Sequence, residues 1–256
     1  MKKKILMYCA GLGLFILLLA PCTEAARPLA TEDAGVAGDK NVQAEISLDY
    51  ASTDTYRNYT FLFVPVYGIG EKFEISAEFP YLIVKPGGEE SLEGLSDINI
   101  VLKTLLVPET AKKPALLLKT VVKLNNGGEE EGFGSGDIDA VFTGVFSKDL
   151  KPFVVHANLG YTFTGKKRDG SLKNYMLYSI AMEYSLNKVI KFMSEIYGES
   201  NSHFDIGAFR HHVINPLIGL TYQFNEKTVL DISFKSGLAG WKNEEFGFSM
   251  GLSLTY

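Results

Sequence analysis

Residues 246–256 read FGFSMGLSLTY, and this closing stretch of the chain decides the fold. A period of two residues is typical of a β-strand whose two faces meet different surroundings. The wide apolar face indicates contact with an apolar medium, and the small face indicates a polar interior. Large and small side chains alternate along the stretch: Phe246, Phe248, Met250, Leu252, Leu254 and Tyr256 against Gly247, Ser249, Gly251, Ser253 and Thr255.

The same alternation recurs along the chain. Each alternating segment is close to the ~9–11 residues with which a tilted strand crosses a bilayer. We therefore predict an all-β fold, a closed antiparallel transmembrane β-barrel of about 12 strands, an even number typical of bacterial outer-membrane barrels. The strands are expected at residues 41–50, 58–67, 73–84, 97–107, 114–124, 137–147, 152–164, 174–185, 189–198, 212–223, 228–238 and 245–256.

The connections between these strands alternate between short and long. Short turns such as GIGEK and FNEK interleave with longer polar segments such as STDTYR and NNGGEEEGFGSG. In outer-membrane barrels short turns face the periplasm and long loops face outside. If the first strand runs outward, all six long connections fall on the outer side. Aromatic residues cluster toward strand ends, as in interfacial girdles: Tyr50, Tyr59, Tyr67, Tyr81, Phe163, Tyr175, Tyr197 and Tyr256.

Pro80 and Pro216 fall inside predicted strands, where the missing N–H is costly in a closed barrel. We expect them at bulges or at the rim. The alternative fold is a soluble β-sandwich or a lipocalin-like barrel with an aromatic core. That alternative would have to bury roughly a dozen apolar strand faces in one small core, and its one-sided long loops would be a coincidence.

The first 25 residues have the composition of a signal peptide. Lysines at positions 2–4 precede an apolar run at residues 5–20, and Thr23–Glu24–Ala25 forms a small-residue cleavage site. We predict a signal peptide at 1–25, a periplasmic N-terminal segment at 26–40 and an outer-membrane β-barrel at 41–256. A single membrane anchor is the alternative, but the apolar run is short for a span of roughly 20 residues.

The predicted mature chain contains no cysteine, because Cys9 and Cys22 lie in the signal peptide. Pro21 directly before Cys22 disfavours lipid attachment there. A cysteine-free exported chain excludes disulfides, thiol catalysis and cysteine-based metal sites. Loss of the signal peptide removes Lys2–Lys4 and Glu24 and changes the formal net charge from −5 to −7. This acidity argues against a nucleic-acid partner.

The polar faces of the predicted strands carry many charges, and we expect them to line a lumen. One interpretation is a polar channel between acidic and basic walls. The other is that charges of both signs pair across a narrow lumen and hold the barrel shut. Further charges on these faces are Glu45, Asp49, Asp139, Glu183, Lys191 and Glu195. The candidate pore-lining residues are Glu74, Glu78, Lys103, Lys119, Lys123, His156, Asp231 and Lys235.

We find no catalytic, cofactor-binding or metal-binding motif. A lipid-hydrolysing barrel would need a histidine beside a serine on the outer wall, but His156 lies in the sequence HAN and faces the lumen. His211 and His212 are adjacent and would point to opposite faces of a strand. We therefore predict that the protein is not an enzyme. Asp97 and Asp137 open two similar strands, and local hydrogen bonding there is favoured over a cation or ligand rim.

Three stretches together resemble an outer-membrane β-barrel family labelled as meta-pathway phenol-degradation proteins, which is transporter-like. They are RPLATEDAG, the hairpin GIGEKFEISAEFPYLIV and the strand SDINIVLK. The resemblance covers the mature chain loosely and transfers no functional residue. It implies passage of small aromatic or apolar molecules. The matching residues are Arg27, Pro28, Leu29, Thr31, Asp33, Ala34, Gly68, Glu74, Ile75, Ser76, Pro80 and Tyr81.

These observations predict an outer-membrane channel or transporter for passive uptake of small solutes, hydrophobic or aromatic ones included. The alternative is a structural or surface-interaction barrel with a closed lumen, acting through its acidic outer loops. The expected partners are outer-membrane lipid, a small-molecule solute, and the barrel-assembly machinery, which would recognise the terminal Tyr256. Residues 26–40 are too short for a plug domain, but we expect them to enter the barrel from the periplasm and gate it.

Overall fold

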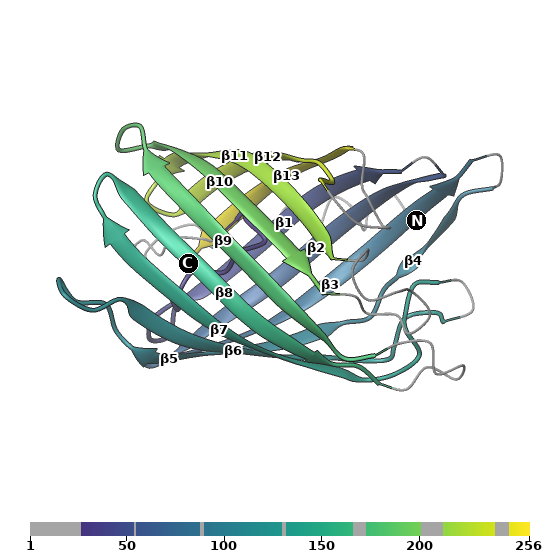
Figure 1. Cartoon of the computed structure of the whole chain (residues 1–256), viewed down its shortest axis with the longest axis horizontal. Coiled ribbons are helices and arrows are strands. Elements are labelled where there is room, and N and C mark those ends of the chain that lie inside the picture. The colour runs from purple at the N-terminus through teal and green to yellow at the C-terminus, as the bar shows by residue number, and fades with distance from the viewer. Residues whose placement is uncertain are drawn as a thin grey trace, which may run out of the picture.

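The computed structural model describes residues 27–53, 55–87, 90–129, 132–165, 173–200, 212–238 and 246–256. The strands in these ranges form one antiparallel sheet that curls into a barrel (Figure 1). Among the described residues there is no helix long and apolar enough to cross a membrane. The strands are β1 (Val42–Ser52), β2 (Tyr56–Ile69), β3 (Phe73–Pro86), β4 (Leu92–Leu95), β5 (Asn99–Val107), β6 (Ala115–Lys123), β7 (Asp139–Leu150), β8 (Phe153–Phe163), β9 (Tyr175–Ser185), β10 (Ile190–Glu199), β11 (Val213–Asn225), β12 (Thr228–Lys235) and β13 (Phe246–Thr255).

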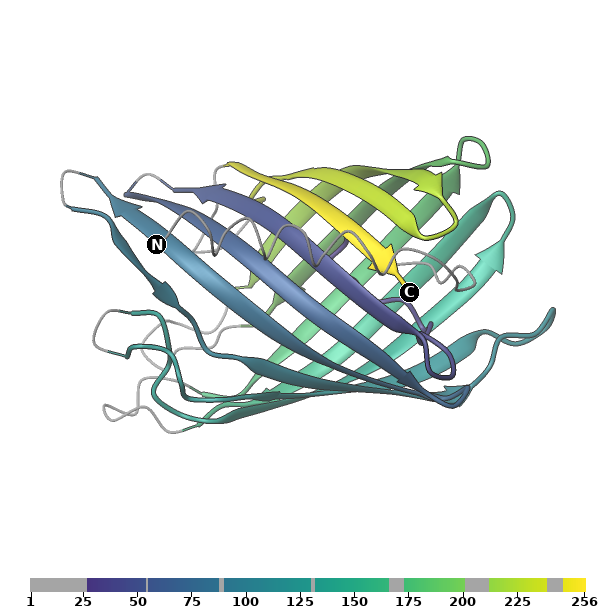
Figure 2. The ribbon, with the colours of Figure 1, turned by 180° about the vertical axis from the view of Figure 1, so that it is seen from behind.

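The barrel is closed by its first and last strands. β1 pairs with β13 from Gln43↔Thr255 to Ser52↔Phe246, and with β2 on its other side. The β2–β3 pairing completes the ring, which Figure 2 shows from behind. The prediction that residues 246–256 pair with the first strand is confirmed.

Two of the thirteen strands share one position in the ring. β4 and β5 both pair with β3, and residues 96–98 interrupt them. Between the pairs Tyr81↔Leu95 and Glu78↔Asn99, β3 advances by three residues and its partner by four, so the interruption acts as a bulge. The barrel therefore has twelve strand positions, as predicted. The single strand expected at 97–107 was wrong at its start, because the pairing with β3 already begins at Leu92, the first residue of β4.

Pro80 and Pro216 lie where a ladder is broken. The N–H of Ser96 donates to the carbonyl of Pro80 (2.9 Å), and that of Ser236 donates to Pro216 (3.2 Å). In an antiparallel strand the N–H and C=O of one residue point to the same side. The missing donor of Pro80 therefore faces the interruption at 96–98, and that of Pro216 faces the chain just beyond β12. The expectation of bulge or rim positions is confirmed.

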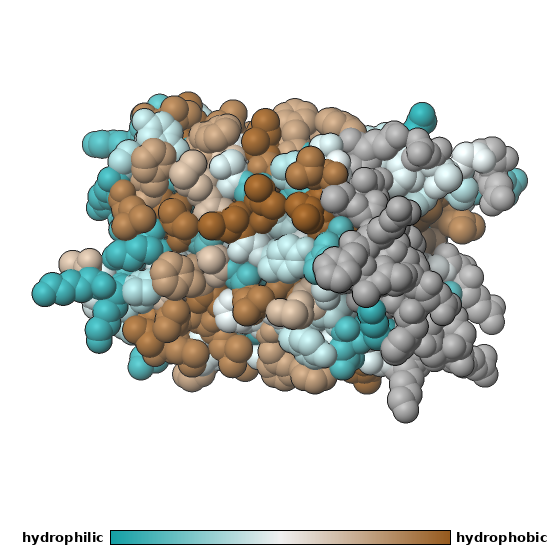
Figure 3. Space-filling model, viewed as in Figure 1, coloured by the Kyte–Doolittle hydropathy of each residue, from teal (hydrophilic) through white to brown (hydrophobic). Residues whose placement is uncertain are grey.

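The outside of the barrel is apolar and its inside is polar. Figure 3 shows large hydrophobic areas over the outer face of the strands. In β13, Phe246 and Met250 are each 44 % exposed, whereas Ser249 and Ser253 are buried on the other side. A surface of this kind belongs in lipid, and a closed barrel is a form in which strands can cross a membrane. The soluble sandwich is excluded, and the chain is an outer-membrane-type barrel.

The connections divide between the two ends. The end with the short turns, such as residues 70–72, 151–152 and 226–227, also carries the start of β1 and the end of β13, and we call it the periplasmic end. The opposite, outer end carries longer connections such as residues 124–138. One expected long loop was wrong. In the stretch STDTYR, β1 and β2 stay paired up to Ser52↔Arg57, and the N–H of Thr53 donates to the carbonyl of Tyr56 (2.9 Å).

Deletion of Tyr256 should lower the fraction of protein that assembles. The N–H of Tyr256 donates to the carbonyl of Val42 (2.8 Å), so the residue completes the seam between the last strand and the first. The measurement is the share of heat-modifiable, folded barrel in outer-membrane fractions. Tyr256→Phe, which keeps the aromatic ring and the backbone bond, should assemble normally. Normal assembly of the shortened chain would contradict the assigned role of the C-terminal aromatic residue.

Candidate functional site

The lumen holds the start of the described chain. Residues 27–40, here called the N-terminal segment, form no regular strand or helix. The segment leaves β1 at the periplasmic end and runs inward, because Ala37 contacts Glu74 of β3 while Arg27 contacts Asp231, at the middle of β12. Its backbone and side chains bond to inward-facing residues of several strands. It therefore lies inside the lumen.

Glu195 of β10 is the first anchor of this segment. Its carboxylate accepts hydrogen bonds from the backbone N–H groups of Ala30 and Thr31 (2.8 Å each) and from the Thr31 hydroxyl (2.6 Å). Glu195 and Thr31 are both buried. A buried carboxylate is costly unless donors surround it, and charge-assisted bonds are the stronger kind. The segment supplies these donors, so it stabilises the charge that the lumen wall presents.

Glu32 is the second anchor and lies between two lysines of neighbouring strands. Lys103 of β5 approaches one carboxylate oxygen at 2.8 Å, and Lys119 of β6 bonds to the other. Lys103 is also 3.6 Å from Glu74, which accepts the N–H of Ala37 (2.7 Å). Two lysines and two glutamates thus form one network of charges inside the barrel.

Burial alone would raise the pKa of Glu32, but Lys103 and Lys119 outweigh it and lower the pKa far below its ordinary value of 4.5. A carboxylate with a lowered pKa stabilises the docked state fully above its ordinary pKa. That contribution is lost only as the pH falls through the lowered value. The second anchor is therefore intact at neutral and mildly acidic pH.

The third anchor is a chain of polar contacts that ends at His156 and Glu183. The N–H of Ala34 donates to Ser147 Oγ (2.8 Å), which lies 2.8 Å from His156 Nδ1. His156 Nε2 is 3.4 Å from Glu183, whose other oxygen is 3.4 Å from Lys191. Serine, histidine and glutamate in this order resemble a hydrolytic triad in composition. However, Ser147 is buried and its oxygen is engaged by the segment, which favours a structural role.

Two inward-facing glycines make room for the tip of the segment. A Cβ atom on Gly219 would lie 2.8 Å from Cγ of Pro28, and one on Gly251 would lie 2.7 Å from Nε of Arg27. Both distances are too short for a side chain. Arg27 itself approaches Asp231 Oδ2 (3.4 Å) and Ser249 Oγ (3.3 Å). The wall is thus shaped to receive Arg27 and Pro28.

A cavity of about 400 Å³ lies in the outer half of the lumen, beyond the segment. Ala30 and Glu32 of the segment contribute to its boundary. Three tyrosines and several aliphatic side chains face it alongside paired charges and amides. The other lining residues are Glu78, Asn99, Lys119, Val121, Lys123, Asp139, Val141, Thr143, Asn158, Thr162, Tyr175, Leu177, Tyr178, Ser179, Tyr197 and Gly198.

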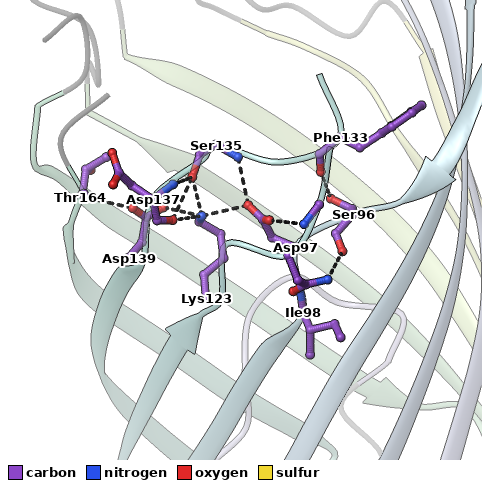
Figure 4. Close-up of polar contacts among 12 residues, drawn as sticks. Ser96, Asp97, Ile98, Lys123, Phe133, Ser135, Asp137, Asp139 and Thr164 are labelled. Carbon is purple, nitrogen blue, oxygen red and sulfur yellow. Dashed lines mark hydrogen bonds and ion pairs between the residues drawn. The ribbon is translucent and has the colours of Figure 1, made fainter. Parts of the chain in front are cut away.

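A network around Lys123 fastens the outer loop at residues 124–138 to the rim of the barrel (Figure 4). Lys123 Nζ lies 2.9 Å from Asp97 and 3.3 Å from Asp139, and donates to Ser135 Oγ and to the carbonyl of Asp137. Asp97 accepts the N–H groups of Gly127 and Ser135 (2.9 Å each).

The expected local hydrogen bonding of Asp97 was wrong, because its carboxylate bonds to Lys123, Gly127 and Ser135, which are distant along the chain. Asp137 takes part through its backbone. Burial would raise the pKa of Asp97, but the donors from Ser135, Lys123 and Gly127 lower it. Phe133 of the same loop is buried against Gly94 and occupies the space that a side chain there would need. The described parts of the loop, residues 124–129 and 132–138, are therefore folded onto the rim.

Lys123→Met should release this loop and speed its cleavage by an added protease several-fold. The change leaves the carboxylates of Asp97 and Asp139 without their cation, and a buried charge without its partner is destabilising. The measurement is limited proteolysis of the refolded barrel with mass spectrometry of the cut sites. Lys188→Met, at the exposed periplasmic β9–β10 turn, is the matched control. Equal cleavage of both variants would contradict the anchoring role.

The structure places the eight predicted pore-lining residues on the inner wall and shows the contacts of most of them. Glu78 accepts a bond from Asn99 (2.7 Å), and the Lys235 side chain lies over Gly247 of β13. That they line a solute path remains a prediction. The sequence did not identify the N-terminal segment's own ligands, Arg27, Thr31 and Glu32, although all three lie in or beside the RPLATEDAG motif.

The histidines and the acidic residues of the described chain provide no catalytic or metal-binding group beyond the contacts given above. The sequence shows no serine beside His156 in its own strand. Ser147 lies directly opposite His156 on β7, as the β7–β8 register shows. His212 lies at the outer end, and its Nδ1 is 3.1 Å from the Tyr178 hydroxyl. His203 and His211 lie outside the described residues. Within the described ranges, no three His, Cys, Asp or Glu residues are grouped as metal ligands.

Comparison with known proteins yields one family. The family model described as "Putative MetA-pathway of phenol degradation" matches residues 25–254. A search of curated proteins finds no significant match. The COG4313 outer membrane channel from Pseudomonas putida F1 has a similar fold, with a TM-score of 0.74, 10 % identity, and coverage of 89 % of this chain and 100 % of that one.

Two porins are also similar in fold. The NanC porin has a TM-score of 0.58 at 10 % identity, covering 82 % of this chain and 98 % of the porin. The KdgM porin has a TM-score of 0.56 at 9 % identity, covering 83 % and 99 %. At such low identity the likeness concerns the fold: both are barrels of the kind described above.

Proposed function

The chain belongs to this phenol-degradation family of outer-membrane barrels, and on that premise we propose that it is a channel for the passive uptake of small solutes, hydrophobic and aromatic ones included. The observation that carries the proposal is the cavity of about 400 Å³ in the outer half of the lumen. A dry cavity of about 150 Å³ is enough to hold benzene, and ligand sites commonly have ~300–1,000 Å³. The cavity therefore accommodates a monoaromatic molecule.

The lining supports a neutral solute. The charges that face the cavity already have partners: Lys123 is bound to Asp97 and Asp139, and Lys119 to Glu32. A charged solute would have to compete with these pairs. A neutral ring can instead pack against aliphatic side chains and tyrosine rings, and its hydroxyl can bond to a tyrosine or an amide. The aliphatic and aromatic lining residues are Val121, Val141, Leu177, Tyr175, Tyr178 and Tyr197.

The N-terminal segment acts as the gate in this proposal. A solute that reaches the cavity meets Ala30 and Glu32 before it can continue to the periplasm. The three anchors hold the segment by hydrogen bonds and ion pairs, which are reversible. Passage then requires partial release of the segment. We assign no catalytic step to Ser147, His156 and Glu183, since they hold Ala34.

Leu177→Trp should lower the initial rate of uptake of a labelled monophenol several-fold in cells that lack other outer-membrane channels. The larger side chain would fill the cavity without touching the anchors. The matched control is Leu159→Trp, because Leu159 is exposed on the lipid-facing side of β8. Equal uptake by both variants would contradict the proposal. Normal heat-modifiable mobility of both variants checks that they fold.

A second candidate function is a closed barrel that acts through its outer loops. The paired lumen charges and the docked segment favour it, because the segment lies inside the lumen and the charges bind one another within it. Planar-bilayer recordings distinguish the two functions. A closed barrel gives no current steps at any salt concentration, with or without the N-terminal segment, whereas a gated channel opens when the segment is removed.

A further inference from the structure

The tip of the N-terminal segment lies in an acidic part of the inner wall. Three carboxylates, Glu45, Asp49 and Asp231, lie on β1 and β12 on either side of β13. The pairs Glu45↔Ser253, Asp49↔Ser249 and Asp231↔Gly251 bring them to the same region of the lumen. We call these three residues together with Ser233 the amino-terminal pocket.

Positive charge is scarce in this pocket. Arg27 is 3.4 Å from Asp231, and it also acts on Glu45 from nearby. Lys103, the other cation close to Glu45, is already bound to Glu32 and Glu74. Asp49 lies close enough to Asp231 for their charges to repel. Lys235, on the same face of β12 as Asp231 and Ser233, extends over Gly247 and is a further cation on this side of the lumen. The three carboxylates still outnumber Arg27 and Lys235.

One oxygen of this pocket lacks a hydrogen-bond donor. Asp231 is 2 % exposed, and its Oδ1 atom has no partner in the part of the chain that the structure describes. The Ser233 hydroxyl, two residues along the same face of β12, is 1 % exposed and is also without a partner there. A buried polar group without a partner loses its bonds to water and gains none in return, so native proteins rarely retain one. Both atoms indicate a missing donor.

The path of the chain identifies that donor. Pro28 Cγ and Ser233 Cβ lie 2.8 and 3.2 Å from the position of a Cβ on Gly219, so the segment passes directly beside Ser233. Covalent geometry holds the nitrogen of residue 26 within about 5 Å of the Arg27 Cα atom. If cleavage follows Ala25, that nitrogen is the α-amino group of the mature protein. It has a positive charge and three donors.

We propose that the amino-terminal pocket binds the α-ammonium group of Ala26, with Asp231 Oδ1 as its main acceptor. The inference rests on the predicted cleavage after Ala25 and not on the proposed channel function. Before cleavage the same nitrogen is an uncharged amide with a single N–H. Cleavage therefore adds a positive charge to a pocket with three carboxylates. Docking of the N-terminal segment is coupled to the processing of the chain.

The test measures the reactivity of the α-amino group in the mature, refolded barrel. Trace acetylation across pH 6–10, followed by mass spectrometry of the N-terminal peptide, yields both the reaction rate and the pKa of the amine. A free α-amino group has a pKa of about 7.7–8.0. In the folded barrel we expect a pKa higher by about one unit, hence a roughly ten-fold slower reaction at neutral pH than in the denatured chain.

Two variants make the test specific. Asp231→Asn should return the pKa and the reaction rate to those of the denatured chain, whereas Asp149→Asn, at the exposed β7–β8 turn, should change neither. A Gly-Ser-Gly extension before Ala26 moves the amine by about 10 Å and leaves the barrel wall untouched. It too should restore ordinary reactivity. Heat-modifiable mobility confirms that each variant is folded.

Ordinary reactivity of the amine in the folded wild-type barrel would overturn the proposal, and so would equal protection in the extended chain. In either case the pocket would be open to a cationic solute or ion instead. Because the readout is the amine and not solute passage, these outcomes are independent of whether the barrel conducts.

Discussion

A mature chain that lacks residues 27–36 should conduct ions several-fold better than the full mature chain in planar bilayers. The deletion removes the donors that occupy Glu195 and Ser147 and the carboxylate that lies between Lys103 and Lys119. It retains Ala37, bound to Glu74, and Gly38, which packs against Gly68 beside β1. The wall of the barrel is thus preserved while its contents are removed.

The matched control for this deletion is Asp39→Asn. Asp39 lies at the periplasmic end of the same segment, and its carboxylate accepts the N–H of Gly70, which an asparagine side chain can also accept. Its conductance should equal that of the unmodified chain. If the shortened chain conducts no better than this control, the segment is not the gate, and the closed-barrel function is favoured.

Glu32→Ala should have the second largest effect, because it removes one carboxylate from two buried cations. The side chains of Lys103 and Lys119 are 15 % and 16 % exposed, and both bind Glu32. Removing one partner of a buried ion pair typically costs about 3–5 kcal/mol. We expect the free energy of docking of the segment to fall by a comparable amount, so that the open state of the channel is populated far more often in single-channel recordings.

A double variant separates charge from packing. In Glu32→Ala/Lys119→Met the remaining Lys103 keeps Glu74, 3.6 Å away, as its partner. The open probability should therefore fall back part of the way toward that of the unmodified chain. Coupling of this kind between contacting residues is what a double-mutant cycle measures. Simple addition of the two single effects would show that Glu32 acts through packing alone.

The fold could be predicted because its main signal is local. Alternation in β13 separates lipid-facing from lumen-facing side chains without reference to any other part of the chain. The interruption at residues 96–98 had no such signal, because a bulge depends on the register with β3. The stretch STDTYR was predicted to be a long loop because its residues are polar. Its outer residues instead continue the ladder between β1 and β2, which depends on the register of the two strands.

Only the strand residues of the site, which form the inner wall of the barrel, could be predicted from the sequence. Strand periodicity directed residues such as Glu74 and Lys103 inward, but it could not reveal what they bind. The N-terminal segment has no period that a sequence pattern could show, and half of its contacts come from backbone N–H groups. The partner of His156, Ser147, lies on another strand, and only the β7–β8 register brings the two together.

The anchors have one consequence for how much variation the segment tolerates. Glu195, Ser147 and Glu74 hold Ala30, Thr31, Ala34 and Ala37 by their main-chain N–H groups. Every amino acid except proline offers that group. The lumen therefore recognises the course of the backbone at these four positions and excludes an imino acid from each of them, whereas Ala34 and Ala37 must also stay small and apolar, because both are buried against apolar residues of the wall.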